Sequence, residues 1–353
     1  MAVEWLTFHL TDRCQLDCQH CLRDPESKPK DLDRAIIRQT LEEGKRIYRA
    51  FHAGFTGGEP TLHPEFLGII DDTVALGFTW HMVSNGKTAA WLFEKLLEKP
   101  SRKDAMTSIT LSLDGADEEM HDGIRGAGSY REVLRAASLC QMHDMKFVIQ
   151  TVIHQRNQHQ IEAIGLLASQ LGAARLSFAM TVPTGTHFDE SFYLTPKAWR
   201  RVMDRIDRLS ATLKLTISSP EGFWNQQPLH VCAPFASQQL HIDVDGNLEL
   251  CCQHAGVPQQ EGARTSQGGN LREKSLTESH RSVLGIIQQA QLDKLEAMTQ
   301  GSFDQGWDEF PCNWCLKYFG KPHWDQEGAA GPGATRERWR GAWSKGKSLP
   351  IVQ

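Results

Sequence analysis

Three cysteines stand close together near the start of the chain. Cys14, Cys18 and Cys21 form a CxxxCxxC pattern directly after an apolar segment that is typical of a strand. Thiols so near one another make poor disulfide partners, and their number is odd, so the spacing favours a metal or cluster site. Four-iron clusters usually take four protein thiolates, so three would leave one iron open for another ligand. A zinc knuckle that lacks one ligand is the alternative.

A second group of cysteines lies in the second half of the chain. It comprises five of the nine cysteines, namely Cys232, Cys251, Cys252, Cys312 and Cys315, and the last two form a CxxC pattern. The ninth, Cys140, falls on the apolar side of a predicted helix, and we expect it to be a core residue.

The composition is that of an ordinary globular protein. The chain has 353 residues, of which 40% are hydrophobic and 23% charged, with a formal net charge of −5. That charge gives no basic field for a nucleic acid, and no apolar run is long enough to span a membrane. The chain does not begin with a signal peptide pattern, so we expect a cytoplasmic protein whose thiols stay reduced.

Six apolar strand-like segments alternate with six helical ones over the first 215 residues. The alternation predicts parallel βα units, which right-handed crossovers curl into a partial (β/α)6 TIM-like barrel. The predicted strands are residues 4–10, 51–55, 79–84, 108–113, 146–153 and 176–182. The predicted helices are residues 32–48, 66–76, 89–98, 130–142, 158–171 and 196–213.

Polar turn residues follow several of these strands. They are Gly57-Gly58-Glu59-Pro60, Ser84-Asn85-Gly86, Ser112-Leu113-Asp114-Gly115 and Pro183-Thr184-Gly185. In an α/β barrel the carboxyl ends of the strands carry the chemistry, and the first cysteine loop also follows a strand. Five loops are therefore expected to converge on one face. Gly and Asn also serve ordinary tight turns, which is the simpler explanation for any one of them.

The regular alternation ends near residue 215. We expect a core barrel at 1–215, a second domain at 220–327 and a surface tail at 328–353. Residues 241–250 predict a hairpin, because alternating apolar positions flank Asp245-Gly246-Asn247. The tail combines Arg and Lys with Trp between 336 and 347. Such a segment can clamp an anionic substrate or a peptide, but it is more often a solvated end.

Taken together, these motifs resemble those of the radical S-adenosylmethionine (SAM) superfamily. The cysteine pattern with His20, the Gly-Gly-Glu-Pro turn and the next two strand ends occur in the superfamily's order. His121-Asp122, Arg125-Gly126 and residues 176–183 are also similar to it. The resemblance covers roughly residues 4–215.

The resemblance implies a [4Fe-4S] cluster on the first three cysteines, with SAM bound at the open iron. Reductive cleavage of SAM would then give methionine and a 5′-deoxyadenosyl radical. Glu59 would accept from the SAM amino group or brace its loop, and Arg125 would pair with the SAM carboxylate. His121 and Asp122 are weaker candidates for proton handling. The implied cofactor-binding residues are Gly57, Gly58, Glu59, Pro60, Ser84, Asn85, Ser112, Asp114, Arg125 and Pro183.

The second half resembles the SPASM/Twitch extension, which holds auxiliary clusters. Because no cysteine follows Cys315, it is similar to the shorter Twitch version with one auxiliary [4Fe-4S] cluster. The implied ligands are Cys232, Cys251, Cys312 and Cys315, with Cys252 as the alternative to Cys251. Four ligands leave no open iron, which suits electron transfer during an oxidation. A purely structural cluster, or zinc on the same thiols, is the alternative.

The resemblance leaves the substrate open between a peptide, as in the maturation of ribosomal peptides, and a small metabolite. Because the cysteine loop begins at residue 14, we expect no fused leader-binding domain, and a separate leader-peptide-binding protein is one expected partner. An electron donor such as flavodoxin or ferredoxin is another. An aminoglycoside-like alcohol dehydrogenase is the alternative enzyme, and a zinc- or cluster-stabilised binding protein is the non-catalytic alternative.

Overall fold

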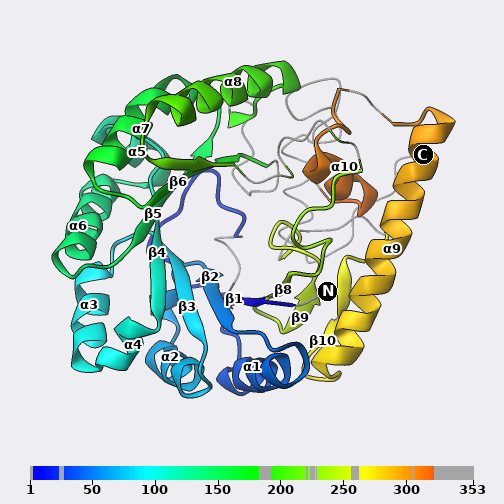
Figure 1. The fold of residues 1–353 in the computed structure, drawn as a ribbon, viewed down its shortest axis with the longest axis horizontal. Coiled ribbons are helices and arrows are strands. Elements are labelled where there is room, and N and C mark those ends of the chain that lie inside the picture. The colour runs from blue at the N-terminus through cyan, green and yellow to red at the C-terminus, as the bar shows by residue number, and fades with distance from the viewer. Residues whose placement is uncertain are drawn as a thin grey trace.

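A computed structural model of the chain describes residues 3–23, 28–182, 192–219, 222, 227, 229–255, 262–303 and 306–321. One ten-stranded sheet organises it, in the order β10-β9-β8-β1-β2-β3-β4-β5-β6-β7. Its parallel strands in chain order are β1 (Trp5–Thr11), β2 (His52–Gly57), β3 (Thr79–Ser84), β4 (Met106–Ser112), β5 (Phe147–Ile153), β6 (Arg175–Met180) and β7 (Thr216–Ser218). Figure 1 shows this sheet curving inside an arc of helices. The predicted partial barrel is therefore confirmed.

The helices of the arc cover the outer face of the sheet. They are α1 (Arg34–Tyr48), α2 (Phe66–Ala75), α3 (Ala89–Glu98), α4 (Pro100–Asp104), α5 (Glu118–Arg125), α6 (Ser129–Met142), α7 (Ile161–Gln170) and α8 (Pro196–Thr212). The short 3₁₀ turns η1 (Pro60–Leu62) and η2 (Gln158–Gln160) precede α2 and α7. The six predicted helices are present. The short helices α4 and α5 were not predicted, because eight residues or fewer carry too little periodicity.

Local chemistry explains where these elements begin and how they pack. Asp33 caps α1, because its side chain accepts a hydrogen bond from the backbone N–H of Ala35. Outward-facing strand residues such as Leu6 and Phe55 are fully buried under the helices. At Gly44 of α1 a Cβ would lie 2.6 Å from Leu6 Cδ1, so the missing side chain lets the helix sit close to β1.

The C-terminal part adds strands to the same sheet. It comprises β8 (Gln239–Ile242), β9 (Asn247–Glu249), β10 (Gln267–Asn270), α9 (Leu276–Gln300) and α10 (Pro311–Tyr318). The predicted hairpin is confirmed, since β8 and β9 pair antiparallel. Strand β8 also pairs in parallel with β1, so the sheet continues across the expected domain boundary near 220. The division into domains stays a prediction, and the tail at 328–353 lies outside the described residues.

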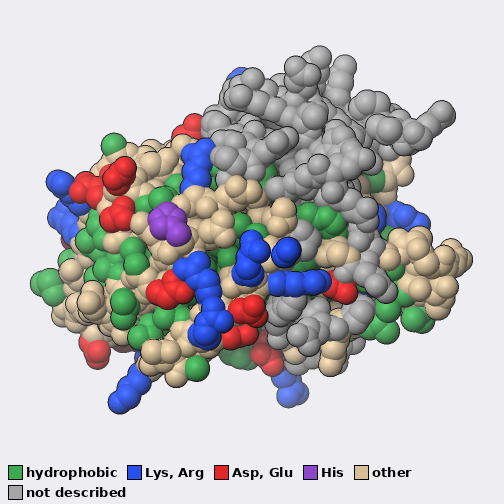
Figure 2. Space-filling view, turned by 90° about the horizontal axis from the view of Figure 1, so that it is seen from above, with side chains coloured by type: hydrophobic (Ala, Val, Ile, Leu, Met, Phe, Trp, Pro, Cys, Tyr) green, Lys and Arg blue, Asp and Glu red, His purple; other side chains and the backbone are tan. Residues whose placement is uncertain are grey.

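The surface carries both acidic and basic side chains. In Figure 2 acidic and basic side chains stand near one another on the face seen from above. Exposed pairs such as Arg38–Glu42, at 2.9 Å, typically contribute only about 0–1 kcal/mol each, so the buried core supplies most of the stability. Within the described residues, no helix is long and apolar enough to cross a membrane.

Candidate functional site

The cysteine loop leaves β1 at the carboxyl edge of the parallel strands. Its backbone is fixed on two sides: Asp12 N–H donates to Lys30 O at 3.0 Å, and Gln19 N–H donates to Ile124 O at 3.0 Å. Cys18 is buried, whereas Cys14 and Cys21 are partly exposed. The loop is therefore held in place by contacts to distant parts of the chain.

Each of the three loop sulfurs accepts hydrogen bonds from N–H groups of the chain. The donors are Leu16 N (3.5 Å) and Asn85 Nδ2 (3.6 Å) to Cys14, Arg125 Nη1 (3.8 Å) to Cys18, and Arg23 N (3.4 Å) to Cys21. N–H donors favour thiolates, which are the form that ligates iron. The donor set therefore fits a cluster on these three residues.

In the protein without a bound cluster, burial has the largest effect on the pKa values of Cys18 and Cys21. Burial raises the pKa of Cys18 to about 12, although the Arg125 guanidinium acts in the opposite direction. Burial also raises the pKa of Cys21. Since metal ligands must be deprotonated, loading this loop would release protons.

Glu59 joins the ends of β2 and β3. Its buried carboxylate accepts from Ser84 Oγ (3.0 Å), from Asn85 N–H (2.9 Å) and from Thr61 Oγ1 (2.9 Å). Burial raises the Glu59 pKa, and these donors oppose that rise. Glu59 thus braces the ends of these strands in the structure, and its expected contact with the SAM amino group stays a prediction. Pro60, which begins η1, stiffens the turn that follows.

The two glycines of the Gly-Gly-Glu-Pro turn bring β2 against the cysteine loop. A Cβ on Gly57 would lie 2.4 Å from Thr11 O, and one on Gly58 would lie 2.3 Å from Arg13 O. Instead, Gly58 N–H donates to Thr11 O and Glu59 N–H donates to Arg13 O, both at 2.7 Å. The resemblance implies that both glycines bind the cofactor. In the structure the close approach is to the cysteine loop, and a contact with SAM stays a prediction.

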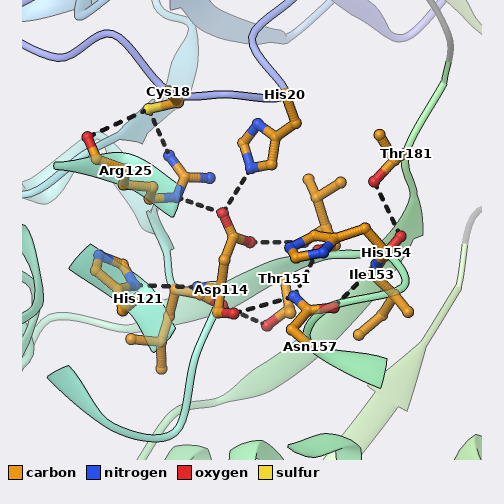
Figure 3. A network of polar contacts seen from close by, with 12 residues as sticks. Cys18, His20, Asp114, His121, Arg125, Thr151, Ile153, His154, Asn157 and Thr181 are labelled. Atoms are coloured by element: carbon orange, nitrogen blue, oxygen red, sulfur yellow. Dashed lines mark hydrogen bonds and ion pairs between the residues drawn. The ribbon is translucent and has the colours of Figure 1, made fainter. Parts of the chain in front are cut away.

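Asp114 lies at the centre of a buried polar network behind this loop (Figure 3). Its carboxylate accepts from Arg125 Nε at 2.5 Å and from Val152 N–H at 2.8 Å, and it lies 2.6 Å from His20 Nε2. Burial alone raises the pKa of Asp114, but Arg125 and His20 outweigh it and hold that pKa far below its usual range. Asp114 therefore stays ionised and ties the loop, α5 and β5 together.

Arg125 connects this network to the cysteine loop. Its guanidinium donates hydrogen bonds to the Asp114 carboxylate and to the Cys18 sulfur. The expected pairing of Arg125 with the SAM carboxylate stays a prediction. Ser112 lies buried at the end of β4, and its contact with the cofactor also stays a prediction. Pro183 lies outside the described residues.

The two candidates for proton handling have different positions. The His121 ring is buried, and its Nδ1 accepts from the Asp114 N–H at 3.1 Å. Asp122 instead accepts from Gly128 N–H (2.6 Å) and Tyr130 N–H (2.8 Å), so it caps the turn into α6. These bonds give Asp122 a structural role.

The end of β5 supplies site residues that the sequence analysis missed. Asn157 Nδ2 donates to Asp114 O at 3.0 Å, and its Oδ1 accepts from His154 N–H at 2.9 Å. The His154 ring packs 4.6 Å from Phe192, and its buried Nε2 has no hydrogen-bond partner among the described residues. A polar run directly after the apolar strand at 147–153 was the available signal.

The second thiol set surrounds one cavity. Cys232, Cys251, Cys312 and Cys315 all line it, whereas Cys252 is exposed and does not. This arrangement favours Cys251 over Cys252 as the fourth ligand. The cavity is also lined by Gly222, where a Cβ would lie 2.3 Å from Cys312 Sγ, and by His254 and Lys294. Four thiols around one space fit a second cluster. Cys140 is buried in the core, as predicted.

Comparison with known proteins finds similarity chiefly in the first part of the chain. Residues 8–168 match the model of the Radical SAM superfamily. The mycofactocin maturase MftC of Mycobacterium tuberculosis is 31% identical over 202 residues, covering 56% of this chain and 49% of that protein. The chain thus spans about half the length of the MftC proteins it matches.

Two further relatives and two solved structures are similar. The AdoMet-dependent heme synthase of Methanosarcina barkeri is 28% identical, covering 57% of both chains, and the PqqA peptide cyclase of Bradyrhizobium diazoefficiens is 24% identical, covering 69% of this chain and 64% of that protein. Streptococcus suis SuiB bound to precursor peptide SuiA gives a TM-score of 0.62 at 15% identity, covering 81% and 66%. Native anSMEcpe with bound AdoMet gives 0.64 at 15% identity, covering 97% and 96%. At these identities the structures support the fold.

The close packing at Gly58 predicts that a methyl group there disturbs the cysteine loop. Gly58→Ala should destabilise the chain by about 1–3 kcal/mol, because the Arg13 carbonyl must move, and should reduce iron uptake. Gly123→Ala in α5 is the matched control, since no atom lies within 4 Å of its Cβ and Ala favours a helix. Thermal unfolding and iron analysis measure both effects. Equal behaviour of the two variants would contradict the packing role.

The buried His154 predicts an acid-sensitive stability. Burial lowers its pKa to about 3, so the unfolded chain gains a proton below about pH 6.5 that the folded chain does not. Between pH 7 and pH 5 this one residue should cost about 2 kcal/mol of unfolding free energy. His154→Asn should remove that loss, and His159→Asn, at an exposed position, should keep it. Urea unfolding at both pH values measures it, and identical pH dependence in all three proteins would refute the assignment.

Proposed function

We propose that the chain is a radical SAM enzyme, which cleaves SAM reductively to begin an oxidative modification of a peptide; the match of residues 8–168 to the Radical SAM superfamily supports this. The observation that carries the proposal is the three-cysteine loop, in which Cys18 is buried and Cys14 and Cys21 are partly exposed. All three of its sulfurs accept hydrogen bonds from N–H groups, and contacts with Lys30, with α5 and with the turn after β2 fix its backbone. Three thiols on a loop whose backbone is held in place suit a four-iron cluster that leaves one iron open for SAM.

The residues of this chain would hold and orient the two groups. Cys14, Cys18 and Cys21 would ligate the cluster, and Arg125 would offset the charge of the Cys18 thiolate. Glu59 and Asp114 would keep the surrounding loops in place, and the buried position of Cys18 would limit access of water. When bound, the cluster and SAM supply an electron and a 5′-deoxyadenosyl radical, which is chemistry that belongs to the cofactors.

The four-thiol cavity supports an oxidative outcome. Cys232, Cys251, Cys312 and Cys315 would occupy all positions of an auxiliary [4Fe-4S] cluster of the Twitch type, so a substrate would have no iron to bind there. Such a site is suited to accept an electron. The reaction would then be a dehydrogenation or the formation of a new bond.

A peptide is the substrate class that the relatives favour. One relative is a peptide cyclase, another is a maturase, and SuiB shares the fold and has been crystallised with its precursor peptide. A separate leader-peptide-binding protein, and a donor such as flavodoxin or ferredoxin, would complete the system. The AdoMet-dependent heme synthase supports the second candidate, which is oxidation of a small metabolite, as in an aminoglycoside-like alcohol dehydrogenase.

Reconstitution tests the first step. With iron and sulfide, then SAM and dithionite under anaerobic conditions, the chain should release 5′-deoxyadenosine, measured by chromatography. Replacing Cys14, Cys18 and Cys21 by Ala should abolish the release, whereas Cys140→Ala, at a buried position in α6, should retain it. Absence of 5′-deoxyadenosine from the unaltered chain, or zinc in place of iron, would favour a non-catalytic binding protein.

The same assay separates the two thiol sets. The double variant Cys312→Ala with Cys315→Ala should lower the iron content from about eight to about four per chain and leave SAM cleavage within about twofold of the unaltered protein. The reason is that the two sets would bind clusters independently. Complete loss of cleavage in this variant, with the fold intact by circular dichroism, would show that the second set belongs to the SAM site.

A further inference from the structure

A lysine lines the cavity of the second thiol set. Lys294 projects from α9 and is buried, with 7% of its surface exposed. Its Nζ lies 5.1 Å from the ring centre of Trp314 and 5.8 Å from that of Phe303. Trp314 and the four cysteines line the same cavity as Lys294.

The described residues provide Lys294 with no carboxylate at salt-bridge distance. The nearby Asp308 is paired with Lys317 at 3.0 Å. A buried ammonium group is costly unless a negative charge compensates it. A four-iron cluster held by four thiolates is negatively charged, so the cavity would supply the missing charge when it is loaded.

A histidine contacts a thiol of the same cavity. His254 Nε2 lies 3.3 Å from Cys315 Sγ, and the ring is held by an edge-to-face contact with Phe319 at 5.2 Å. The His254 backbone N–H donates to Cys251 O at 3.0 Å, which fixes His254 beside Cys251. A second N–H, from Gln253, points at the Cys251 sulfur at 3.3 Å.

We propose that Lys294 and His254 are positioning residues that raise the reduction potential of the auxiliary cluster, so that it can oxidise a substrate radical. The inference rests on the proposed function. Reduction adds a negative charge to the cluster, and a cation or an N–H donor beside the sulfurs stabilises that charge in a low-dielectric site. The substrate radical would lose one electron to the oxidised cluster and one proton to a base, giving the oxidised product. An external one-electron acceptor would then reoxidise the cluster.

A redox titration followed by electron paramagnetic resonance tests this assignment on the full chain. Replacing Cys14, Cys18 and Cys21 by Ala leaves the auxiliary signal alone for measurement. In that background Lys294→Met should shift the midpoint potential to a more negative value with unchanged iron content. Lys294→Arg should retain the original potential, because the cation is kept. Arg281→Met, which removes an exposed cation from the same helix, is the matched control and should leave the potential unchanged.

Each outcome decides the inference. An unchanged potential in Lys294→Met with full iron content would overturn it, while SAM cleavage by the unaltered chain would still support the proposed function. If Lys294→Met fails to bind iron, the unaltered chain provides the second test. Its auxiliary signal should be reduced at a less negative potential than the signal of the loop cluster, and the reverse order, or absence of a second cluster, would overturn the inference.

Discussion

The buried carboxylate of Asp114 is the interaction on which the candidate site depends. It joins His20 of the cysteine loop, Arg125 of α5 and the backbone of β5, so one charge fixes three segments that are far apart in the chain. Removing one partner of such a buried pair typically costs about 3–5 kcal/mol, because the remaining charge stays uncompensated. The placement of Cys18 therefore depends on the protein's own charges before any cofactor binds.

The sheet relates the two thiol sets to each other. Strand β8 runs parallel to β1, and β9 returns antiparallel to it. The loop of Cys14 follows the carboxyl end of β1. Because β9 runs in the opposite direction, Cys251 follows the end of β9 that lies on the side of the amino ends of β1 and β8. The strand directions thus separate the two sets, in line with the proposed division between SAM cleavage and electron acceptance.

Local sequence features predicted much of this arrangement. Apolar runs and polar turns located the strands and their ends, and cysteine spacing located the first thiol set, because each of these signals lies within a few residues. The ligands of the second set came from the family resemblance, since those cysteines are far apart in the chain. The sequence did not predict that β8 would join β1, or that Arg125 would pair with Asp114 and Cys18. These partners depend on how the crossovers pack, and spacing alone does not fix them. His154 was missed for the same reason, since its position beside the network follows from the place of β5 in the sheet.

The central claim is that the three-cysteine loop holds a cluster with one iron available to SAM and that the second set holds a complete one. Mössbauer spectroscopy of the chain reconstituted with ⁵⁷Fe, recorded with and without SAM, tests it most directly. The account predicts two four-iron clusters, with about one iron in eight changing its spectrum when SAM is added. A spectrum that SAM leaves unchanged, or one that contains a single cluster, would contradict it.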